Sequence, residues 1–397
     1  MNRETAFLRY QAQITKTPFL LDIEKAKGSY IYTKDKKKYI DLIAGVSSCT
    51  LGHSHPNIIN AIKKQLDLHT HVMVYGEFIQ TTPLKLAETL VEYLPKKLNC
   101  IYLVNSGTEA VEGAIKLAKR KNRRRKIISC FNSYHGSTQG AFSTIGNEEI
   151  KEKYKPLIPD HYHIRYNNID DLKILKNDVS AIIIEPIQGG SHFICAEKKW
   201  LQEIRNKCDK YSIELIFDEI QTGFGRTGKM FGFELYNVIP DILCLAKGMG
   251  GGMPIGAFIS KKENMDYLSN HPQLGHITTF GGHPISCAAA LATFNELRKS
   301  NIIEKVNDKR LLFEKNLRHS SIKKIHGKGL MIALEFETET LCKNIIENLL
   351  MNGVITFYFL FDRKNIRISP PLNISNKEII QACDIIKRTI DNQKSVT

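Results

Sequence analysis

Apolar and polar residues alternate on two length scales through the middle of the chain. Short, almost continuously apolar runs cover residues 101–105, 126–130, 180–186, 214–219 and 241–246. This pattern predicts buried strands of a mostly parallel sheet that is covered on both faces. Residues 109–120 and 200–211 instead carry apolar residues at three- and four-residue spacing, which is typical of amphipathic helices. Strands and helices in this alternation predict the α/β class.

The two ends of the chain follow a different pattern. Residues 28–42 hold two alternating runs around a charged turn, which predicts a hairpin. After Pro284 come helical stretches at 285–300 and 306–320 and strand-like runs at 329–337, 354–361 and 365–372, with a further helix among them. We therefore expect a large domain flanked by a smaller α+β domain built from both termini. The predicted small domain comprises residues 1–50 and 286–397, and the large domain comprises residues 51–285.

The composition is that of an ordinary globular protein. Of the 397 residues, 42% are hydrophobic and 24% are charged. No apolar stretch approaches the ~20 residues that a membrane span requires. Residues 1–13 lack the apolar core of a secretory signal, so we expect a cytoplasmic protein that does not bind membranes. Nine scattered cysteines without a CxxC pair indicate neither a disulfide framework nor a zinc site, and we expect no metal.

The net charge of +15 raises the question of nucleic-acid binding, and a basic run at residues 116–126 sharpens it. Two observations favour a structural explanation. Lysine is spread along the whole chain, and the run ends a predicted helix, where cations complement the helix dipole. No aromatic residues are interleaved with the run, as they are in many RNA-binding surfaces. We therefore predict no nucleic-acid partner and keep such binding as a remote alternative.

The strongest chemical signal is a lysine and an aspartate at the ends of two predicted strands. Asp218 ends the run ELIFD, and Lys247 follows the run ILCLA at the start of a glycine-rich loop. Amine chemistry on a pyridoxal ring needs both groups. A lysine holds the aldehyde as a Schiff base, and an acid keeps the ring nitrogen protonated.

Further motifs follow other predicted strands. Small residues in NSGTEA, residues 105–110, leave backbone N–H groups free at a helix start, where the dipole favours a phosphate. The alternative there is a capping box between Ser106 and Glu109. Tyr134 in SYHGST can lay its ring on a planar cofactor, although an ordinary loop aromatic has the same pattern.

Two more strand ends carry an acid followed by an amide. Glu185 lies in the motif EPIQ and Asp218 in the motif DEIQTGFGRTG. Ligands of open α/β sheets bind at the carboxyl ends of the strands, so we expect these polar groups to gather at one edge. The eleven residues of DEIQTGFGRTG are far more specific than a lone aspartate at a strand end, which is usually a turn or cap residue.

Together these motifs resemble the class III pyridoxal-phosphate aminotransferases of fold type I. This family includes ornithine, acetylornithine, 4-aminobutyrate and diaminopelargonate aminotransferases. The resemblance runs from residues 28–56 through 218–228 and the lysine loop to 276–290 and 366–372. The motifs stand in the family's order and at its usual spacings.

The resemblance implies a role for each matching residue, with pyridoxal 5′-phosphate as cofactor. Lys247 would form the Schiff base and move the proton, and Asp218 would pair with the pyridine nitrogen. Tyr134 would stack on the ring, and Thr279 would reach the phosphate in the neighbouring subunit, which implies a homodimer with shared active sites. The remaining cofactor-binding residues implied by the motifs are Ser106, Gly107, Thr108, Glu185 and Gln221.

The substrate-binding positions depart from the family pattern. Arg367 matches the arginine that grips a substrate carboxylate. Ornithine- and acetylornithine-type members have an arginine where this chain has Ser137, and they usually carry a glutamate shortly after EPIQG, where this chain has none. Arg367 is therefore expected to stay open to an acidic substrate. Tyr75 lies where the substrate gate of the family falls, and the nearby Glu77 either holds a substrate amine or caps the helix that begins near Thr82.

The leading hypothesis is an aminotransferase that moves a terminal amino group from an amino-acid or amine donor onto 2-oxoglutarate or pyruvate. The sequence leaves an alternative on the same fold, an aminomutase of the glutamate-semialdehyde type, which needs no separate acceptor. The element TTFGGHP fits transaminases better.

Overall fold

The centre of the computed structural model, which describes residues 2–394, is a seven-stranded sheet. Its strand order is β4-β10-β9-β8-β7-β5-β6, and only β10 runs antiparallel to its neighbours. The strands are β4 (Cys100–Val104), β5 (Lys126–Cys130), β6 (His161–Ile164), β7 (Val179–Ile184), β8 (Glu214–Asp218), β9 (Ile242–Leu245) and β10 (Gly256–Ser260). The five predicted strands and the mostly parallel α/β sheet are confirmed; β6 and β10 had not been predicted.

Alternate residues of each strand face two different hydrophobic cores. On one face, Ile183 and Ile216 pack with the apolar side of α5 (Gly107–Asn122). On the other face, Ile182 and Leu215 pack with Trp200 and its neighbours on α8 (Lys198–Tyr211). Both helices were predicted from their apolar spacing, and each covers the sheet as a layer of an α/β fold.

Two four-stranded sheets are built from the ends of the chain. One has the order β1-β2-β3-β13 and the other β11-β12-β15-β14. Their strands are β1 (Ile23–Lys27), β2 (Tyr30–Thr33), β3 (Lys38–Asp41), β11 (Lys324–His326), β12 (Ile332–Glu335), β13 (Val354–Ile355), β14 (Phe357–Tyr358) and β15 (Asn365–Ile368). The N-terminal hairpin is confirmed, and β13 pairs in parallel with β3, so the two ends of the chain share one sheet.

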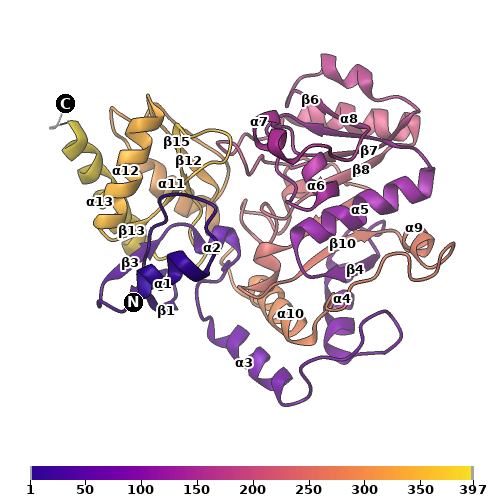
Figure 1. Ribbon diagram of the computed structural model, residues 1–397, viewed down its shortest axis with the longest axis horizontal. Coiled ribbons are helices and arrows are strands. Elements are labelled where there is room, and N and C mark those ends of the chain that lie inside the picture. The colour runs from indigo at the N-terminus through magenta and orange to yellow at the C-terminus, as the bar shows by residue number, and fades with distance from the viewer. Residues whose placement is uncertain (1, 395–397) are drawn as a thin grey trace.

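The apolar run at 354–361 forms two short strands rather than one. β13 and β14 lie in different sheets, with the buried Thr356 between them. Figure 1 shows the indigo and yellow ends of the chain together on one side and the seven-stranded sheet with its helices on the other. The domain boundaries at residues 50 and 285 remain predictions.

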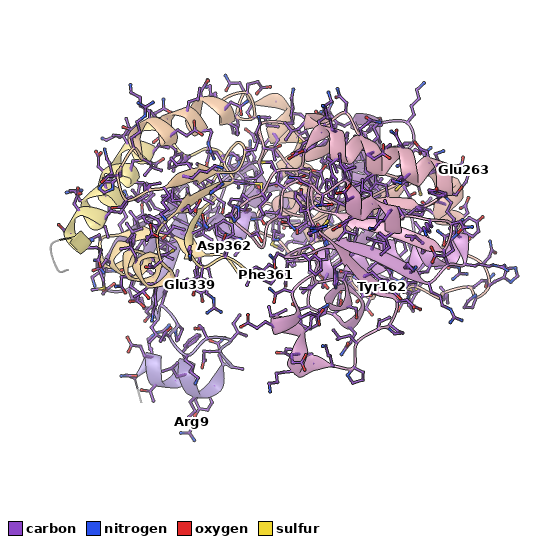
Figure 2. All side chains as sticks on the ribbon, turned by 90° about the horizontal axis from the view of Figure 1, so that it is seen from above. Arg9, Tyr162, Glu263, Glu339, Phe361 and Asp362 are labelled. Atoms are coloured by element: carbon purple, nitrogen blue, oxygen red, sulfur yellow. The ribbon has the colours of Figure 1, made fainter. Side chains whose placement is uncertain are left out.

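Helices complete the layers around the three sheets. Beside α5 and α8 they are α1 (Arg3–Tyr10), α2 (Ala44–Ser47), α3 (Pro56–Leu66), α4 (Thr81–Tyr93), α6 (Gln139–Ser143), α7 (Glu148–Lys151), α9 (Lys262–Met265), α10 (Pro284–Lys299), α11 (Val306–Asn316), α12 (Glu339–Met351) and α13 (Asn376–Lys394). Helix α1 buries none of its residues and projects from the body at Arg9 (Figure 2). None of the helices between residues 2 and 394 is long and apolar enough to cross a membrane.

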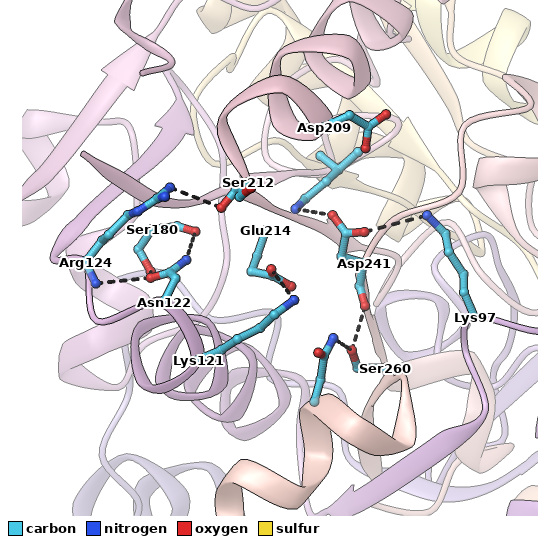
Figure 3. A network of polar contacts seen from close by, with 12 residues as sticks. Lys97, Lys121, Asn122, Arg124, Ser180, Asp209, Ser212, Glu214, Asp241 and Ser260 are labelled. Carbon is cyan, nitrogen blue, oxygen red and sulfur yellow. Dashed lines mark hydrogen bonds and ion pairs between the residues drawn. The ribbon is translucent and has the colours of Figure 1, made fainter. Parts of the chain in front are cut away.

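Much of the basic run anchors the end of α5 to the sheet. Lys121 forms an ion pair of 2.7 Å with Glu214, and the Arg124 guanidinium donates to the carbonyl oxygens of Tyr211 at 2.8 Å and Ser212 at 3.1 Å (Figure 3). Only a few cations of the run, among them Arg123 and Arg125, are exposed. The run therefore has a structural role that accounts for much of its charge.

Helix α5 lies close against the sheet at Gly113. A Cβ at this position would lie 2.2 Å from Cε1 of Phe258, a fully buried side chain on β10. Because Phe258 has no free space to move into, only glycine allows this approach. The close packing sets the height of α5 above the strands.

We expect Gly113→Ala to lower the free energy of unfolding. Alanine would gain about 0.5–1 kcal/mol in helix propensity, but overpacking a core costs about 1–3 kcal/mol, so the clash outweighs the gain. Denaturant unfolding of the cofactor-free protein measures the change, with the exposed Lys199→Ala on α8 as control. Equal or higher stability of Gly113→Ala would contradict this account of the packing.

Candidate active site

The carboxyl ends of five strands meet at one cavity of about 720 Å³. Residues after β4, β5, β7, β8 and β9 line its floor, as ligand sites in open α/β sheets require. The N-terminal Ile43 and Val46 and the C-terminal Phe357 and Leu360 form its rim. The cavity therefore lies between the large sheet and the elements from the chain ends. Of the predicted site residues it brings together Ser106, Gly107, Thr108, Tyr134, Ser137, Glu185, Asp218, Gln221, Lys247 and Arg367.

Lys247 enters the cavity directly after β9. Its φ of 41° lies in the left-handed region, which is strained for a residue with a long side chain. Such strain persists only where the surrounding structure holds it, and it is concentrated at functional sites. Burial lowers the pKa of the Lys247 amine, and the nearby Arg367 lowers it further, whereas Asp218 opposes this shift. The amine therefore loses its proton more easily than a lysine in water.

Asp218 is held by two hydrogen bonds at the end of β8. Its Oδ2 lies 2.7 Å from Nδ1 of His135, and its Oδ1 accepts from the backbone N–H of Ile220 at 3.1 Å. His135 is fully buried and its Nε2 has no partner among the described residues. The sequence motifs had indicated no role for His135. Its position directly after the aromatic Tyr134, at the end of a buried strand, was the signal available.

The N-terminus of α5 forms the opposite side of the cavity. Ser106 is the N-cap, and its Oγ accepts from the backbone N–H of Glu109 at 3.3 Å. The reciprocal half of the predicted capping box is absent, because Oε2 of Glu109 accepts from the backbone N–H of Asn105 at 2.7 Å. A Cβ on Gly107 would lie 2.7 Å from Cδ1 of Ile220. This helix end thus offers first-turn N–H groups to the cavity, where an anion is favoured.

Hydroxyl groups surround this helix end. Oγ1 of Thr108 lies 2.7 Å from Oγ1 of Thr138, which donates to Glu112 at 2.5 Å. The Tyr134 hydroxyl lies 2.9 Å from Oγ of Ser137, so these two cavity residues form a hydrogen bond with each other. The structure thus adds Thr138, for which the sequence motifs indicate no role, to the environment of Thr108.

Glu185 shapes the loop that follows β7. Its carboxylate accepts from the backbone N–H groups of Tyr134 at 3.1 Å and Gly189 at 2.7 Å. Burial raises its pKa to about 7, while the charge of His135 acts in the opposite direction. Gln221 is also buried in the cavity wall, where its Nε2 lies 3.4 Å from Oγ of Ser47.

Arg367, on β15, brings a second buried cation to the cavity. Its guanidinium carbon lies 4.6 Å from the ring centre of Phe359 and 5.3 Å from that of Phe193, and one terminal nitrogen donates to the carbonyl oxygen of Gly189. Its Nε is buried without a partner, and the ion pairs formed among residues 2–394 do not include it. Burial lowers the pKa of Arg367 to about 10. Among residues 2–394, Arg367 therefore has no carboxylate partner at ion-pair distance.

Tyr75 and Thr279 lie away from this cavity. Tyr75 lines a second cavity of about 460 Å³ together with Thr278, and Thr279 is exposed beside it. A hydrogen bond of 2.8 Å from Asn105 to Thr278 links the walls of the two cavities. The capping alternative for Glu77 is wrong, because the N-cap of α4 is Gln80. In residues 2–394 no cluster of histidine, cysteine and acidic side chains could hold a metal ion.

Comparisons with known proteins agree with this geometry. The sequence model of the Aminotransferase class-III family matches residues 11–390. Acetylornithine aminotransferase of Clostridium acetobutylicum is 35% identical over 386 residues, which cover 94% of this chain and 97% of that protein. Adenosylmethionine-8-amino-7-oxononanoate aminotransferase of Methanocaldococcus jannaschii superposes with a TM-score of 0.90 at 31% identity, covering 98% of each chain.

A third relative shows the cofactor. The amine transaminase of an uncultivated Pseudomonas species, solved with bound pyridoxal phosphate, has a TM-score of 0.88 and 25% identity, covering 96% of this chain and 98% of that one. The fold predicted from the sequence motifs, that of the pyridoxal-phosphate aminotransferases, is confirmed. The chain belongs to the class III aminotransferases, enzymes that transfer an amino group with pyridoxal phosphate as cofactor.

Proposed function

We propose that this aminotransferase moves a terminal amino group onto 2-oxoglutarate or pyruvate. One observation carries the proposal: a single cavity holds the buried Lys247, the anchored Asp218, the N-terminus of α5 and the unpaired Arg367. The first three suit the cofactor, and the fourth suits an acidic substrate.

The residues of the cavity fit pyridoxal phosphate. The N–H groups at the start of α5, with Ser106, Gly107 and Thr108, would hold the phosphate, because Gly107 leaves room where a Cβ would clash. Lys247 would hold the aldehyde, and Tyr134, Glu185 and Gln221 would surround the ring. When bound, the cofactor supplies a cationic ring that accepts the electrons of a broken Cα–H bond.

Asp218 would keep the ring nitrogen protonated. His135 donates to one carboxylate oxygen and the N–H of Ile220 to the other, so the carboxylate is fixed in orientation. A fixed carboxylate costs no reorganisation when charge develops nearby. His135 therefore acts as a positioning residue for Asp218.

Lys247 would move the proton at the substrate carbon. A general base works best when its pKa lies near the operating pH. Burial and the positive charge of Arg367 both lower the pKa of this amine from its ordinary value of 10.5, in the required direction.

Arg367 would bind the carboxylate of the acceptor. A buried guanidinium without a counter-ion is costly, and a carboxylate supplies both the charge and a bidentate match to the fork. The rings of Phe193 and Phe359 lie beside the guanidinium and limit its movement. An acceptor such as 2-oxoglutarate or pyruvate carries the carboxylate that would bind Arg367.

The rim of the cavity favours a donor with an apolar chain next to its amine. Ile43, Val46, Phe357 and Leu360 line it, and Ser137 is uncharged. Apart from Lys247, which would hold the cofactor, the described lining residues include no other lysine or arginine that could bind a carboxylate far from Arg367. Acetylornithine aminotransferases are among the enzymes similar to this chain, and the apolar rim favours terminal amines more broadly than that single donor.

A homodimer forms the second part of the proposal. The second cavity is bordered by exposed apolar side chains, among them Phe78 at 57% and Ile79 at 92% of full exposure. Patches of this kind mark interfaces, and a second copy of the chain would cover it. Thr279 lies at this surface and not in the Lys247 cavity. A residue that contacts the phosphate in the partner's site would lie at such a surface.

A donor panel tests the transfer itself. The purified holoenzyme is incubated with terminal amines and amino acids in the presence of 2-oxoglutarate or pyruvate, and the formation of glutamate or alanine is measured. We expect turnover with at least one donor. Turnover of a single substrate without any added keto acid would instead favour the aminomutase, and no product from any donor in a broad panel would contradict both.

The pKa of Lys247 predicts a pH dependence for cofactor uptake. Only the neutral amine attacks the aldehyde, so uptake by the cofactor-free protein should rise with pH and reach its midpoint below 10.5. Arg367→Gln removes a positive charge, which raises the pKa of Lys247 and shifts the midpoint to higher pH. The uncharged change Ser137→Ala serves as control. An unchanged midpoint in Arg367→Gln would contradict the electrostatic argument.

We expect Ile79→Glu to separate the subunits, because it places a charge in the centre of an apolar interface. Sedimentation should show a dimer for the parent and a monomer for the variant, and the variant should bind pyridoxal phosphate more weakly because the partner's contribution is lost. Met351→Glu, on α12 and 81% exposed, is the matched control. A monomeric parent with full activity would refute the shared site.

A further inference from the structure

Two hairpin tips from distant parts of the chain meet beside Arg367. The first spans residues 189–193, in a loop closed by the bridge between Ile187 and Cys195. The second spans residues 359–362, between β14 and β15. Figure 2 shows Phe361 and Asp362 near the middle of the molecule, where the two halves adjoin. In the sequence, the first tip differs from the family pattern because it lacks the glutamate that usually follows EPIQG.

Polar contacts join the two tips. The backbone N–H of Phe361 donates to the carbonyl oxygen of Gly190 at 3.1 Å, and Nδ1 of His192 lies 2.5 Å from Oδ2 of Asp362. A Cβ on Gly190 would lie 2.6 Å from the Phe361 ring, so the tips are in close contact. The side chains of His192 and Asp362 remain 29% and 26% exposed.

The joined tips form three sides of the Arg367 site. Gly189 in the first tip accepts from the guanidinium, and Phe193 of the first tip and Phe359 of the second flank it. The two rings meet edge to face with centroids 4.7 Å apart. Separating the tips would therefore remove the carbonyl and one ring from Arg367 together.

The first tip is strained and needs an external support. Phe193 has a φ of 56°, a left-handed conformation that is unfavourable for a bulky side chain. Its neighbour His192 is held on a second side by the ring of His326, with centroids 4.6 Å apart, and His326 is bonded to Glu335 at 2.7 Å. Strain of this kind persists only where surrounding contacts maintain it.

We propose that the His192–Asp362 pair is a positioning element for Arg367, which locks the two tips together and thereby sets the affinity of the site for a substrate carboxylate. The pair itself does not touch the substrate. This inference rests on the proposed role of Arg367. This chain lacks the glutamate expected after EPIQG. In its place, His192 would fix the position of Arg367 through the two joined tips.

The test measures binding of glutarate, a dicarboxylate with no amine or keto group, to the holoenzyme by calorimetry. The variants are His192→Ala, Asp362→Ala, their double mutant, Asp362→Asn and Arg367→Gln. His319→Ala is the matched control, because His319 forms a similar ion pair of 2.9 Å with Asp391 but does not line the cavity. The absorbance of the bound cofactor reports whether each variant keeps an intact Lys247 site.

We expect His192→Ala and Asp362→Ala each to weaken glutarate binding about tenfold, because a small displacement of a fixed charge is costly. The double mutant should be no weaker than either single mutant, since both remove the same contact. Asp362→Asn should bind close to the parent, because its amide oxygen still accepts from Nδ1–H. His319→Ala and the cofactor absorbance should be unchanged.

The outcomes separate this inference from the proposed function. If Arg367→Gln weakens glutarate binding but the His192 and Asp362 variants do not, the positioning role is refuted while the function stands. If Arg367→Gln binds as the parent does, or the parent binds no glutarate, the proposed carboxylate site is refuted and the positioning role with it. Additive losses in the double mutant, or loss of the cofactor absorbance, would also overturn the inference.

Discussion

The site depends on one constraint, the burial of two cations, Lys247 and Arg367, at the edge of a sheet. Desolvation lowers the pKa of both groups, and the carboxylates of Asp218 and Glu185 only partly offset it. The unfolded chain holds the lysine proton more tightly, so Lys247 opposes folding at pH values below 10.5, and this penalty disappears above its unfolded pKa. The remainder of the fold must supply the stability that offsets it. The same burial gives the Lys247 amine a lowered pKa, and it would leave the Arg367 guanidinium open to the anion of the proposed substrate.

The two hydrophobic cores of the seven-stranded sheet supply this stability. Apolar residues on both faces of β7, β8 and β9 are buried, so the strand ends are rigid where Asp218 and Lys247 leave them. Neighbouring strands in register place Asp218 opposite Cys244, three residues before the lysine. The elements from the chain ends then close the cavity with Arg367. Strands β8 and β15 carry Asp218 and Arg367, Lys247 directly follows β9, and the two joined loop tips flank Arg367.

The sequence predicted the elements whose signals are local. The apolar runs identified five strands of the sheet, and DEIQTGFGRTG with the lysine loop identified Asp218 and Lys247. It could not show that the imidazole of His135 binds Asp218, because that contact joins residues 83 positions apart. The tips around Arg367 depend on pairing between loops that follow different sheets, and the rim depends on side chains from both chain ends. The placement of Tyr75 and Thr279 on a second surface likewise arises from tertiary structure.

Chemical trapping of the lysine tests the central claim most directly. Holoenzyme reduced with borohydride should carry the pyridoxyl group in a stable secondary amine, and proteolysis with mass spectrometry locates it. The account predicts a single modified peptide that contains Lys247, because this is the buried amine with a lowered pKa in the cavity that also holds Asp218. Modification of a different lysine, or a protein that stays colourless when saturated with pyridoxal phosphate, would contradict it.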